Sequence, residues 1–212
     1  MSYIPALQII TQRITLQGNS YIDYPVLVGM VNTAIQDKIN YTILSMVNKL
    51  YNAQVRQLLN QGYPHILPMD IMGWYEIKTN ERGILSLSLG NYTMTYPAAH
   101  GWTTIKSLTF DIQTGKLYQL YDLFKPDSNY MQVLSDLISA QIKARNISLI
   151  SPYKGIKPCS QDYYIADKAL VIYYQLVEFT AYANGFPVFP ISVYEIENLI
   201  KPGAPLDKML AP

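Results

Sequence analysis

One long amphipathic segment constrains the fold of this chain more than any other feature. Apolar residues recur in it at spacings of three and four, with polar residues between them, which predicts a helix from Pro25 to about Asn60. Pro25 suits a first helical turn, and Gly62-Tyr63-Pro64 would end the helix. The apolar stripe comprises Val28, Val31, Ile35, Ile39, Ile43, Met46 and Leu50. Such a helix must cover its stripe on a sheet or on another chain, and we expect the simpler arrangement, packing on its own sheet.

Strand patterns surround this helix. Residues 85–89 alternate leucine with serine, which gives a strand with one apolar and one polar face. The alternation changes phase after Gly90-Asn91, and a β-bulge at that point would produce such a change. Further predicted strands lie within residues 7–16, 73–78, 102–112 and 169–174.

The C-terminal part adds helices. A second amphipathic stripe follows Pro126-Asp127-Ser128 and extends from Tyr130 to Ile142. The capping-box spacing of Ser192 and Glu195 predicts a short final helix through Ile200, with a loosely held tail beyond Ala204. Strands and helices do not alternate regularly, so we expect an α+β fold with mainly antiparallel sheets, covered by the long first helix and the second amphipathic helix.

Composition excludes several classes of function. The formal net charge is +1 and the basic residues are scattered, so nucleic-acid binding is not expected. No stretch has the length and apolarity of a membrane span. The N-terminus lacks the pattern of a secretory signal, so we expect a cytoplasmic protein, with association with the envelope or the spore left open.

Catalytic and metal-binding patterns are not recognisable. The chain has two histidines, His65 and His100, and one cysteine, Cys159, which are too few for a typical zinc site without a carboxylate ligand. Cys159 lies between Pro158 and Ser160 and has no histidine near it in sequence, so we interpret it as an incidental thiol. We therefore predict no catalytic residues, no metal and no cofactor.

The turn around His100 is the main candidate for a binding site. Small neighbours, Ala99 and Gly101, would let another backbone or a ligand approach the imidazole. His100 could bond backbone in a turn, which we favour, or recognise a ligand, or take part in catalysis. The candidate binding residues are Tyr96, His100, Trp102 and Tyr182. The chain has 19 tyrosines, and we expect most of them to be structural.

Several short motifs, taken in order, resemble a domain family of unknown function. They are Gln36-Asp37-Lys38-Ile39-Asn40, Ala98-Ala99-His100-Gly101, Thr109-Phe110-Asp111, Thr114-Gly115-Lys116, Asp122-Leu123-Phe124, Asp162-Tyr163-Tyr164, Val171-Ile172-Tyr173-Tyr174-Gln175, Tyr182-Ala183 and Gly185-Phe186-Pro187. This family forms the extracellular part of lysozyme-sensing anti-sigma factors, the N-terminal part of some peptidoglycan deacetylases, and short stand-alone proteins of spore-forming bacteria. The chain looks most like the stand-alone proteins.

The resemblance implies two interlocked halves, residues 1–98 and 99–212, that meet near the His100 turn in one globular unit. The anti-sigma group reads Gly-Gly-Ala-His at this turn, whereas Pro97-Ala98-Ala99 precedes His100 here. Deacetylases carry a Thr-Phe-Asp-Asp metal motif, but Ile112 follows Asp111 in this chain. We therefore interpret Asp111 as the acceptor for amides of the following turn.

Three functions remain open. The first is a non-enzymatic module that binds a protein or a cell-wall-related ligand. The second is a structural protein of sporulating bacteria that assembles through homo-oligomerisation along the first helix. The third is an unrecognised hydrolase, for which no Gly-x-Ser-x-Gly nucleophile motif is present.

Overall fold

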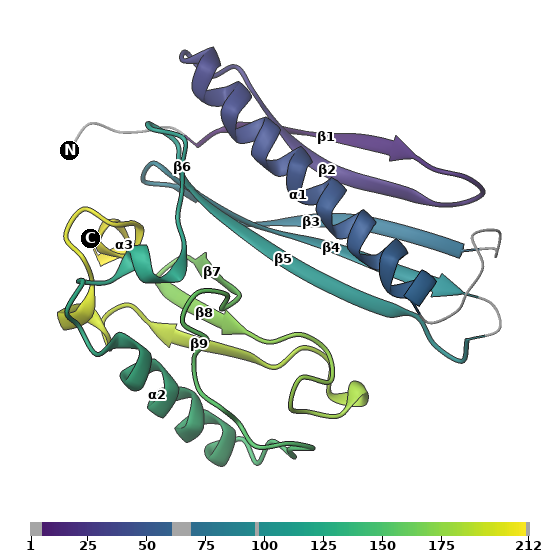
Figure 1. The fold of residues 1–212 in the computed structure, drawn as a ribbon. Helices are drawn as coiled ribbons and strands as arrows, with labels where there is room; N and C mark the ends of the chain where they lie inside the picture. The colour runs from purple at the N-terminus through teal and green to yellow at the C-terminus, as the bar shows by residue number, and fades with distance from the viewer. Residues whose placement is uncertain (1–5, 61–68, 96–97, 211–212) are drawn as a thin grey trace.

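The computed structural model describes residues 6–60, 69–95 and 98–210, and it confirms the α+β class. A six-stranded sheet carries the long helix α1 (Thr33–Asn60) on one face, and a three-stranded sheet with α2 (Tyr130–Ala144) lies on the other side (Figure 1). The first sheet follows chain order: β1 (Gln8–Thr15), β2 (Tyr21–Val28), β3 (Met69–Glu81), β4 (Ile84–Thr95), β5 (Trp102–Asp111) and β6 (Lys116–Leu117). Only β2 and β3 are parallel among its strand pairs in the described residues, so this sheet is mainly antiparallel.

The second sheet is antiparallel throughout and has β8 (Ala169–Tyr173) at its centre, between β7 (Tyr163–Ala166) and β9 (Val188–Ser192). The apolar run of β8 is almost entirely buried, as its composition predicted. Connections contain short 3₁₀ turns, η1 (Leu120–Leu123), η2 (Tyr182–Asn184) and η3 (Glu197–Leu199). The first sheet contains strands from both predicted halves, 1–98 and 99–212, because β5 belongs to the second half and pairs with β4 of the first.

The first helix packs on its own sheet, which was the favoured arrangement, but it begins later than predicted. Its buried residues include Ile39, Ile43, Val47 and Leu50, which contact the leucine row of β4. Pro25 does not start the helix; it lies in β2, paired with Thr11 of β1. The register of β2 with β3 covers only Tyr21 and Ile22, so Pro25 lies where β2 has no strand on its other side and its missing N–H is tolerated.

The helix itself completes the hydrogen bonding of β2. The side-chain amide of Asn40 accepts a hydrogen bond from the Leu27 amide at 2.8 Å and donates one to the Leu27 carbonyl at 2.9 Å. Asn40 therefore occupies the place of a neighbouring strand at Leu27. One helical side chain thus fixes α1 against the edge of β2.

The polar face of β4 is buried, because the second sheet covers it. Ser86 accepts a hydrogen bond from the Ile165 amide at 3.0 Å. Thr79 of β3 donates to the Ile165 carbonyl at 2.8 Å and accepts from the Asp167 amide at 3.2 Å. These hydroxyls supply hydrogen-bond partners for the backbone groups on the free edge of β7. The two sheets therefore meet through hydrogen bonds from side-chain hydroxyls, here called the hydroxyl seam, as well as through apolar contact.

The β-bulge predicted at Gly90 is wrong. The register of β4 with β5 runs without interruption from Ile84 to Thr93, and the irregularity in this region lies in β3, between Ile77 and Thr79. Gly90 has a different role: a Cβ placed there would lie 2.5 Å from the ring of Trp74. The change of phase in the sequence therefore has a cause other than a bulge.

The C-terminal segment also differs from the prediction. Ser192 pairs with Ala169 at the end of β9, so it cannot cap a helix, and a turn with η3 follows it. The segment beyond Ala204 forms α3 (Pro205–Leu210). It is not loosely held, because Leu206 and Met209 are fully buried in the second core.

Asp111 holds the turn after β5, as predicted, and also anchors α3. One carboxylate oxygen accepts from the amides of Gln113 and Thr114, both at 2.9 Å, and the other accepts from Lys208 at 2.8 Å. Burial opposes ionisation of Asp111, but the hydrogen bond from Lys208 and the turn amides outweigh it, so the pKa of this carboxyl lies below its ordinary value.

We expect Thr79→Val to destabilise the protein by about 1–3 kcal/mol, because it leaves the buried Ile165 carbonyl without its hydrogen-bond donor and the Asp167 amide without its acceptor. Urea unfolding measures the loss. Thr15→Val, on the exposed side of the edge strand β1, is the matched control and should be nearly neutral. Equal effects of the two substitutions would show that the hydroxyl seam does not join the sheets.

We expect Asp111→Asn to lower the free energy of unfolding at neutral pH by about 1–3 kcal/mol. Because the folded pKa of Asp111 is lowered, its carboxylate adds its full share to the free energy of unfolding above the unfolded pKa. This stabilisation is lost as the pH falls through the lower folded pKa. The variant should therefore lose less stability than the wild type on acidification below pH ~4. Urea unfolding across this pH range, with the exposed Asp127→Asn as control, checks both effects. Identical acid profiles of wild type and Asp111→Asn would contradict the assignment.

Candidate functional site

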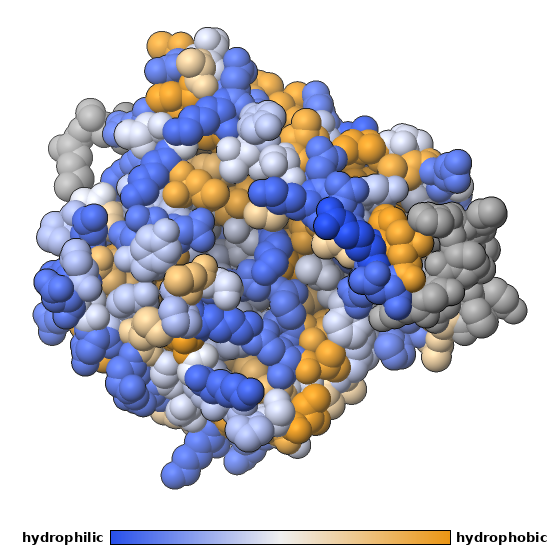
Figure 2. Space-filling view, viewed as in Figure 1, coloured by the Kyte–Doolittle hydropathy of each residue, from blue (hydrophilic) through white to orange (hydrophobic). Residues whose placement is uncertain are grey.

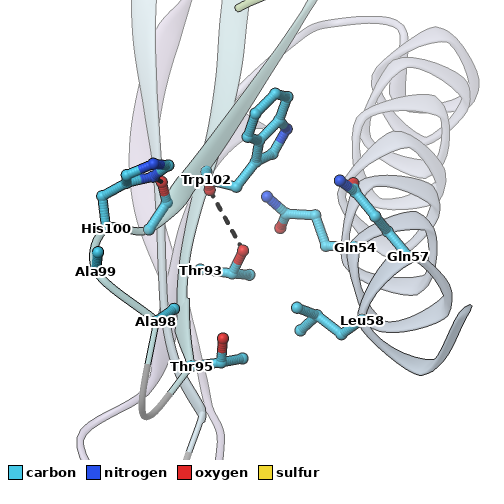
Figure 3. A pocket seen from close by; sticks show the side chains of 10 residues that line it. Gln54, Gln57, Leu58, Thr93, Thr95, Ala98, Ala99, His100 and Trp102 are labelled. Atoms are coloured by element: carbon cyan, nitrogen blue, oxygen red, sulfur yellow. Dashed lines mark hydrogen bonds between the residues drawn. The ribbon is translucent and has the colours of Figure 1, made fainter. Parts of the chain in front are cut away.

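A cavity of about 400 Å³ lies between the C-terminal half of α1 and the ends of β4 and β5 (Figure 3). The helix contributes Gln54, Gln57 and Leu58, and β4 contributes Thr93 and Thr95. The rest of the wall comes from residues 98–102, which contain the His100 turn and the first residue of β5. Its volume is at the lower end of the range for small-ligand sites.

The cavity begins where the face of β4 under α1 changes from apolar to polar. Residues 85, 87 and 89 are leucines in the core beneath the helix. The next residues on the same face are Asn91, Thr93 and Thr95, and all are buried. The strand is regular, so the phase change in its sequence marks this change of environment rather than a bulge.

The buried face of α1 also changes from apolar to polar at this end of the sheet. The buried stripe of α1 continues from Leu50 to Gln54, which is 2% exposed. In Figure 3 the Gln54 side chain extends from α1 toward β4, and its amide nitrogen donates to the Asn91 carbonyl at 2.8 Å. Among the described residues, Oε1 of Gln54 and Nδ2 of Asn91 are buried without a hydrogen-bond partner.

The His100 turn closes one side of the cavity and is held by the second sheet. The imidazole of His100 stacks on the Tyr182 ring of η2, with centroids 4.4 Å apart and planes at 28°. The Tyr182 hydroxyl donates to the Gly101 carbonyl at 2.8 Å, and Nδ1 of His100 donates to the same oxygen at 3.2 Å. The Trp102 ring lies 6.3 Å from that of Tyr182.

Gly101 is required for this close packing. A Cβ at that position would lie 2.3 Å from the ring of Tyr92, so no other residue fits without a shift. On the cavity side, Thr93 donates to the Trp102 carbonyl at 3.3 Å and ties β4 to β5 (Figure 3). The turn is therefore fixed from both faces of the sheet.

The structure brings together His100, Trp102 and Tyr182, which were predicted as binding residues, whereas Tyr96 lies outside the described residues. A binding role for them stays a prediction. Sequence reasoning missed the polar residues of the wall, which are Gln54, Gln57, Thr93 and Thr95, and the buried Asn91 that Gln54 contacts. Two patterns could have found them, the glutamine in an apolar stripe and the change of phase after Gly90.

The chemistry of this wall is that of neutral hydrogen bonding. No charged residue lines the cavity within the part of the chain that the structure describes. In the same residues no group of three or more His, Cys, Asp or Glu side chains could hold a metal ion. The hydrogen bond of His100 goes to a backbone carbonyl rather than to a hydroxyl or a thiol, so the hydrolase hypothesis gains no support there.

Two family profiles match successive parts of the chain. The profile described as deacetylase PdaC matches residues 17–103, and the profile described as a protein of unknown function (DUF3298) matches residues 121–194. No curated protein matches the sequence. The predicted resemblance to a domain family of unknown function is thus confirmed.

Solved structures show the same fold. A member of the DUF3298 family from Bacteroides fragilis superimposes with a TM-score of 0.71 at 12% sequence identity, over 100% of both chains. A DUF3298 family protein from Pseudomonas aeruginosa gives a TM-score of 0.70 at 13% identity, over 99% of this chain and 98% of that one.

None of the helices in the described residues has the length and apolarity that a membrane span requires.

We expect Tyr182→Ala to loosen the His100 turn, because it removes both the stacked ring and the hydrogen bond to Gly101. Amide hydrogen exchange of residues 98–101 should become about tenfold faster, the equivalent of one lost interaction of about 1.4 kcal/mol. Tyr182→Phe keeps the ring and should have a smaller effect, and Tyr41→Ala on the exposed side of α1 is the control. Unchanged exchange in Tyr182→Ala would mean that the second sheet does not hold the turn.

Proposed function

We propose that this chain is a non-enzymatic binding module that recognises a protein or a cell-wall-related ligand at the cavity beside the His100 turn. The observation that carries this proposal is the set of buried polar side chains around the cavity. The same helix and strand present isoleucine and leucine to each other elsewhere. Gln54 and Thr93 each donate one hydrogen bond to a strand carbonyl. Their remaining hydrogen-bonding capacity, together with the hydroxyl of Thr95, is what a ligand in the cavity would use.

Family resemblance supports a ligand from the cell wall without specifying it. One matching profile is described as a deacetylase, and its matched residues include α1, β4 and the His100 turn, which line the cavity. The resemblance to envelope-facing domains points in the same direction. We infer that this chain uses its cavity for recognition only, because the described wall offers neutral hydrogen-bonding side chains and His100 bonds to a backbone carbonyl.

We expect the wild-type protein to co-sediment with purified cell-wall sacculi or to retain a partner from a protein fraction, and His100→Ala and Trp102→Ala to lose about tenfold in retention. Tyr194→Ala, an exposed tyrosine outside the cavity wall, is the control. Circular dichroism establishes that each variant is folded. Equal retention of the folded variants, or no retention of the wild type by either fraction, would contradict a recognition site at this turn.

Assembly through α1 is the second candidate, and the exposed ring of Tyr41, 76% accessible, is the observation that favours it. The rest of the outer side of the helix includes polar residues such as Asp37, Lys38 and Lys49. Figure 2, in the same view as Figure 1, shows hydrophilic and hydrophobic residues interspersed rather than gathered in one apolar band. Sedimentation velocity of the wild type and Tyr41→Glu distinguishes the candidates, because only assembly through α1 predicts an oligomer that the added charge dissociates.

A further inference from the structure

In the described residues, three of the four outer strand edges of the two sheets are protected from pairing with another strand. The β6 edge is only two residues long, and the β7 edge bonds to the hydroxyl seam. On β9, Arg145 donates to the Val188 carbonyl and Gln141 donates to the Pro190 carbonyl, both at 2.8 Å. An unprotected edge is a template for a further strand, so the fourth edge, that of β1, is the candidate interface.

The β1 strand lacks the features that usually prevent pairing at an edge. It contains no lysine, proline or glycine, and its register with β2 is unbroken over eight residue pairs. Its one charged side chain, that of Arg13, is already paired with Asp23 of β2 at 2.6 Å. Six of its eight residues are exposed, and Ile10 among them is 42% accessible. The edge is therefore long, regular and open to another strand.

The backbone groups at this free edge follow from the pairing of β1 with β2. In an antiparallel pair, hydrogen-bonded residue pairs alternate with pairs whose N–H and C=O groups point away from each other. Thr11 faces Pro25, which has no N–H, and Ile9 faces Leu27, whose N–H and C=O both bond to Asn40. Both are therefore pairs of the second kind. The odd-numbered residues of β1 thus present their N–H and C=O groups at the free edge: Ile9, Thr11, Arg13 and Thr15.

The sequence of β1 is close to self-complementary around Gln12. If a second copy pairs antiparallel about a twofold axis at Gln12, Ile10 of each copy faces Ile14 of the other, and Thr11 faces Arg13. Apolar side chains then meet across the strands, and the two arginines do not face each other. The odd-numbered residues also face each other, so their free N–H and C=O groups form the hydrogen-bonded pairs. A peptide from an unrelated partner would not require this symmetry, whereas a twofold dimer does.

We propose that β1 is a dimerisation edge, at which two copies of this chain pair antiparallel about Gln12 and join their six-stranded sheets. The interface goes beyond the proposed function, because β1 contributes no residue to the described wall of the cavity. It also differs from assembly through α1, since α1 covers a face of the sheet and β1 forms its edge (Figure 1). One twofold contact supplies hydrogen-bond partners to the free edges of both copies at once.

Sedimentation velocity of the full chain over a range of concentrations tests the dimer. We expect the wild type to dimerise, and Ile10→Lys to weaken the dimer at least about tenfold, because it places a charge against the isoleucine of the other copy. Ile150→Lys is the matched control, since Ile150 is 58% exposed and lies outside β1. Tyr41→Glu should leave this dimer intact, and circular dichroism checks that each variant is folded. A wild type that stays monomeric at the highest concentration, or a dimer that Ile10→Lys does not weaken, would overturn the proposal.

Disulfide trapping tests the register, in a Cys159→Ser background that removes the exposed native thiol. Gln12→Cys should cross-link two copies on mild oxidation, because the two Cα atoms at the axis would lie about 4.5 Å apart, within reach of a disulfide. Ile10→Cys is the control, since its two copies would lie about 14 Å apart and should not cross-link. The double variant Ile10→Cys/Ile14→Cys should cross-link, and it replaces Gln12→Cys if that variant does not fold. Cross-linking by Ile10→Cys alone, or none by the folded Gln12→Cys and double variants, would show that the copies do not pair about Gln12.

Discussion

The hydroxyl seam between the two sheets is the contact on which the rest of the fold depends. An edge strand placed against the face of another sheet would bury unpaired amide and carbonyl groups. Thr79 and Ser86 supply the missing partners for Ile165 and Asp167, and Thr109 completes the set by bonding to Ser86 at 2.9 Å. Because Ser86 and Thr109 lie between large apolar residues in β4 and β5, which point to the opposite face, one sheet can serve two cores. Its apolar face packs on α1, and its polar face holds the second sheet in a fixed position.

The same strand that joins the layers also creates the cavity. Along β4 the face under α1 is apolar up to Leu89 and polar from Asn91 onward, and α1 changes correspondingly between Leu50 and Gln54. Two surfaces that interlock as leucine and isoleucine cannot continue to interlock as threonine and glutamine, because the polar groups need directed partners. The helix and the sheet therefore leave space between them at this end. Within the described residues, the cavity follows from the local composition of α1 and β4, both of which are unbroken there.

Sequence patterns predicted the elements well where one periodicity dominates, and failed where a tertiary contact decided the outcome. The stripe of α1, the Leu85–Leu89 alternation and the turn after Asp111 are local features, and the structure confirms them. Pro25 was misplaced because its tolerance depends on where β3 stops pairing with β2, which no local pattern shows. Ser192 has capping-box spacing, but pairing with Ala169 takes precedence. His100, Trp102 and Tyr182 could be proposed from the sequence around the turn. Gln54 and Asn91 each break a local pattern, but only the packing of α1 on β4 shows that they are in contact.

The position of Tyr182 links the cavity to the layer that does not line it. The cavity lies on the α1 side of the first sheet, yet the carbonyl that fixes its turn, that of Gly101, accepts from a tyrosine of the second sheet's β8–β9 connection. Gly101 cannot move toward Tyr92, whose ring already occupies the space of a side chain. Any shift of the turn must therefore move Tyr182 or break its hydrogen bond and its stacking on His100. A ligand that displaced the turn would therefore also displace the β8–β9 connection. The hydroxyl seam and the hydrogen bond to the Gly101 carbonyl thus couple the two layers beside the cavity.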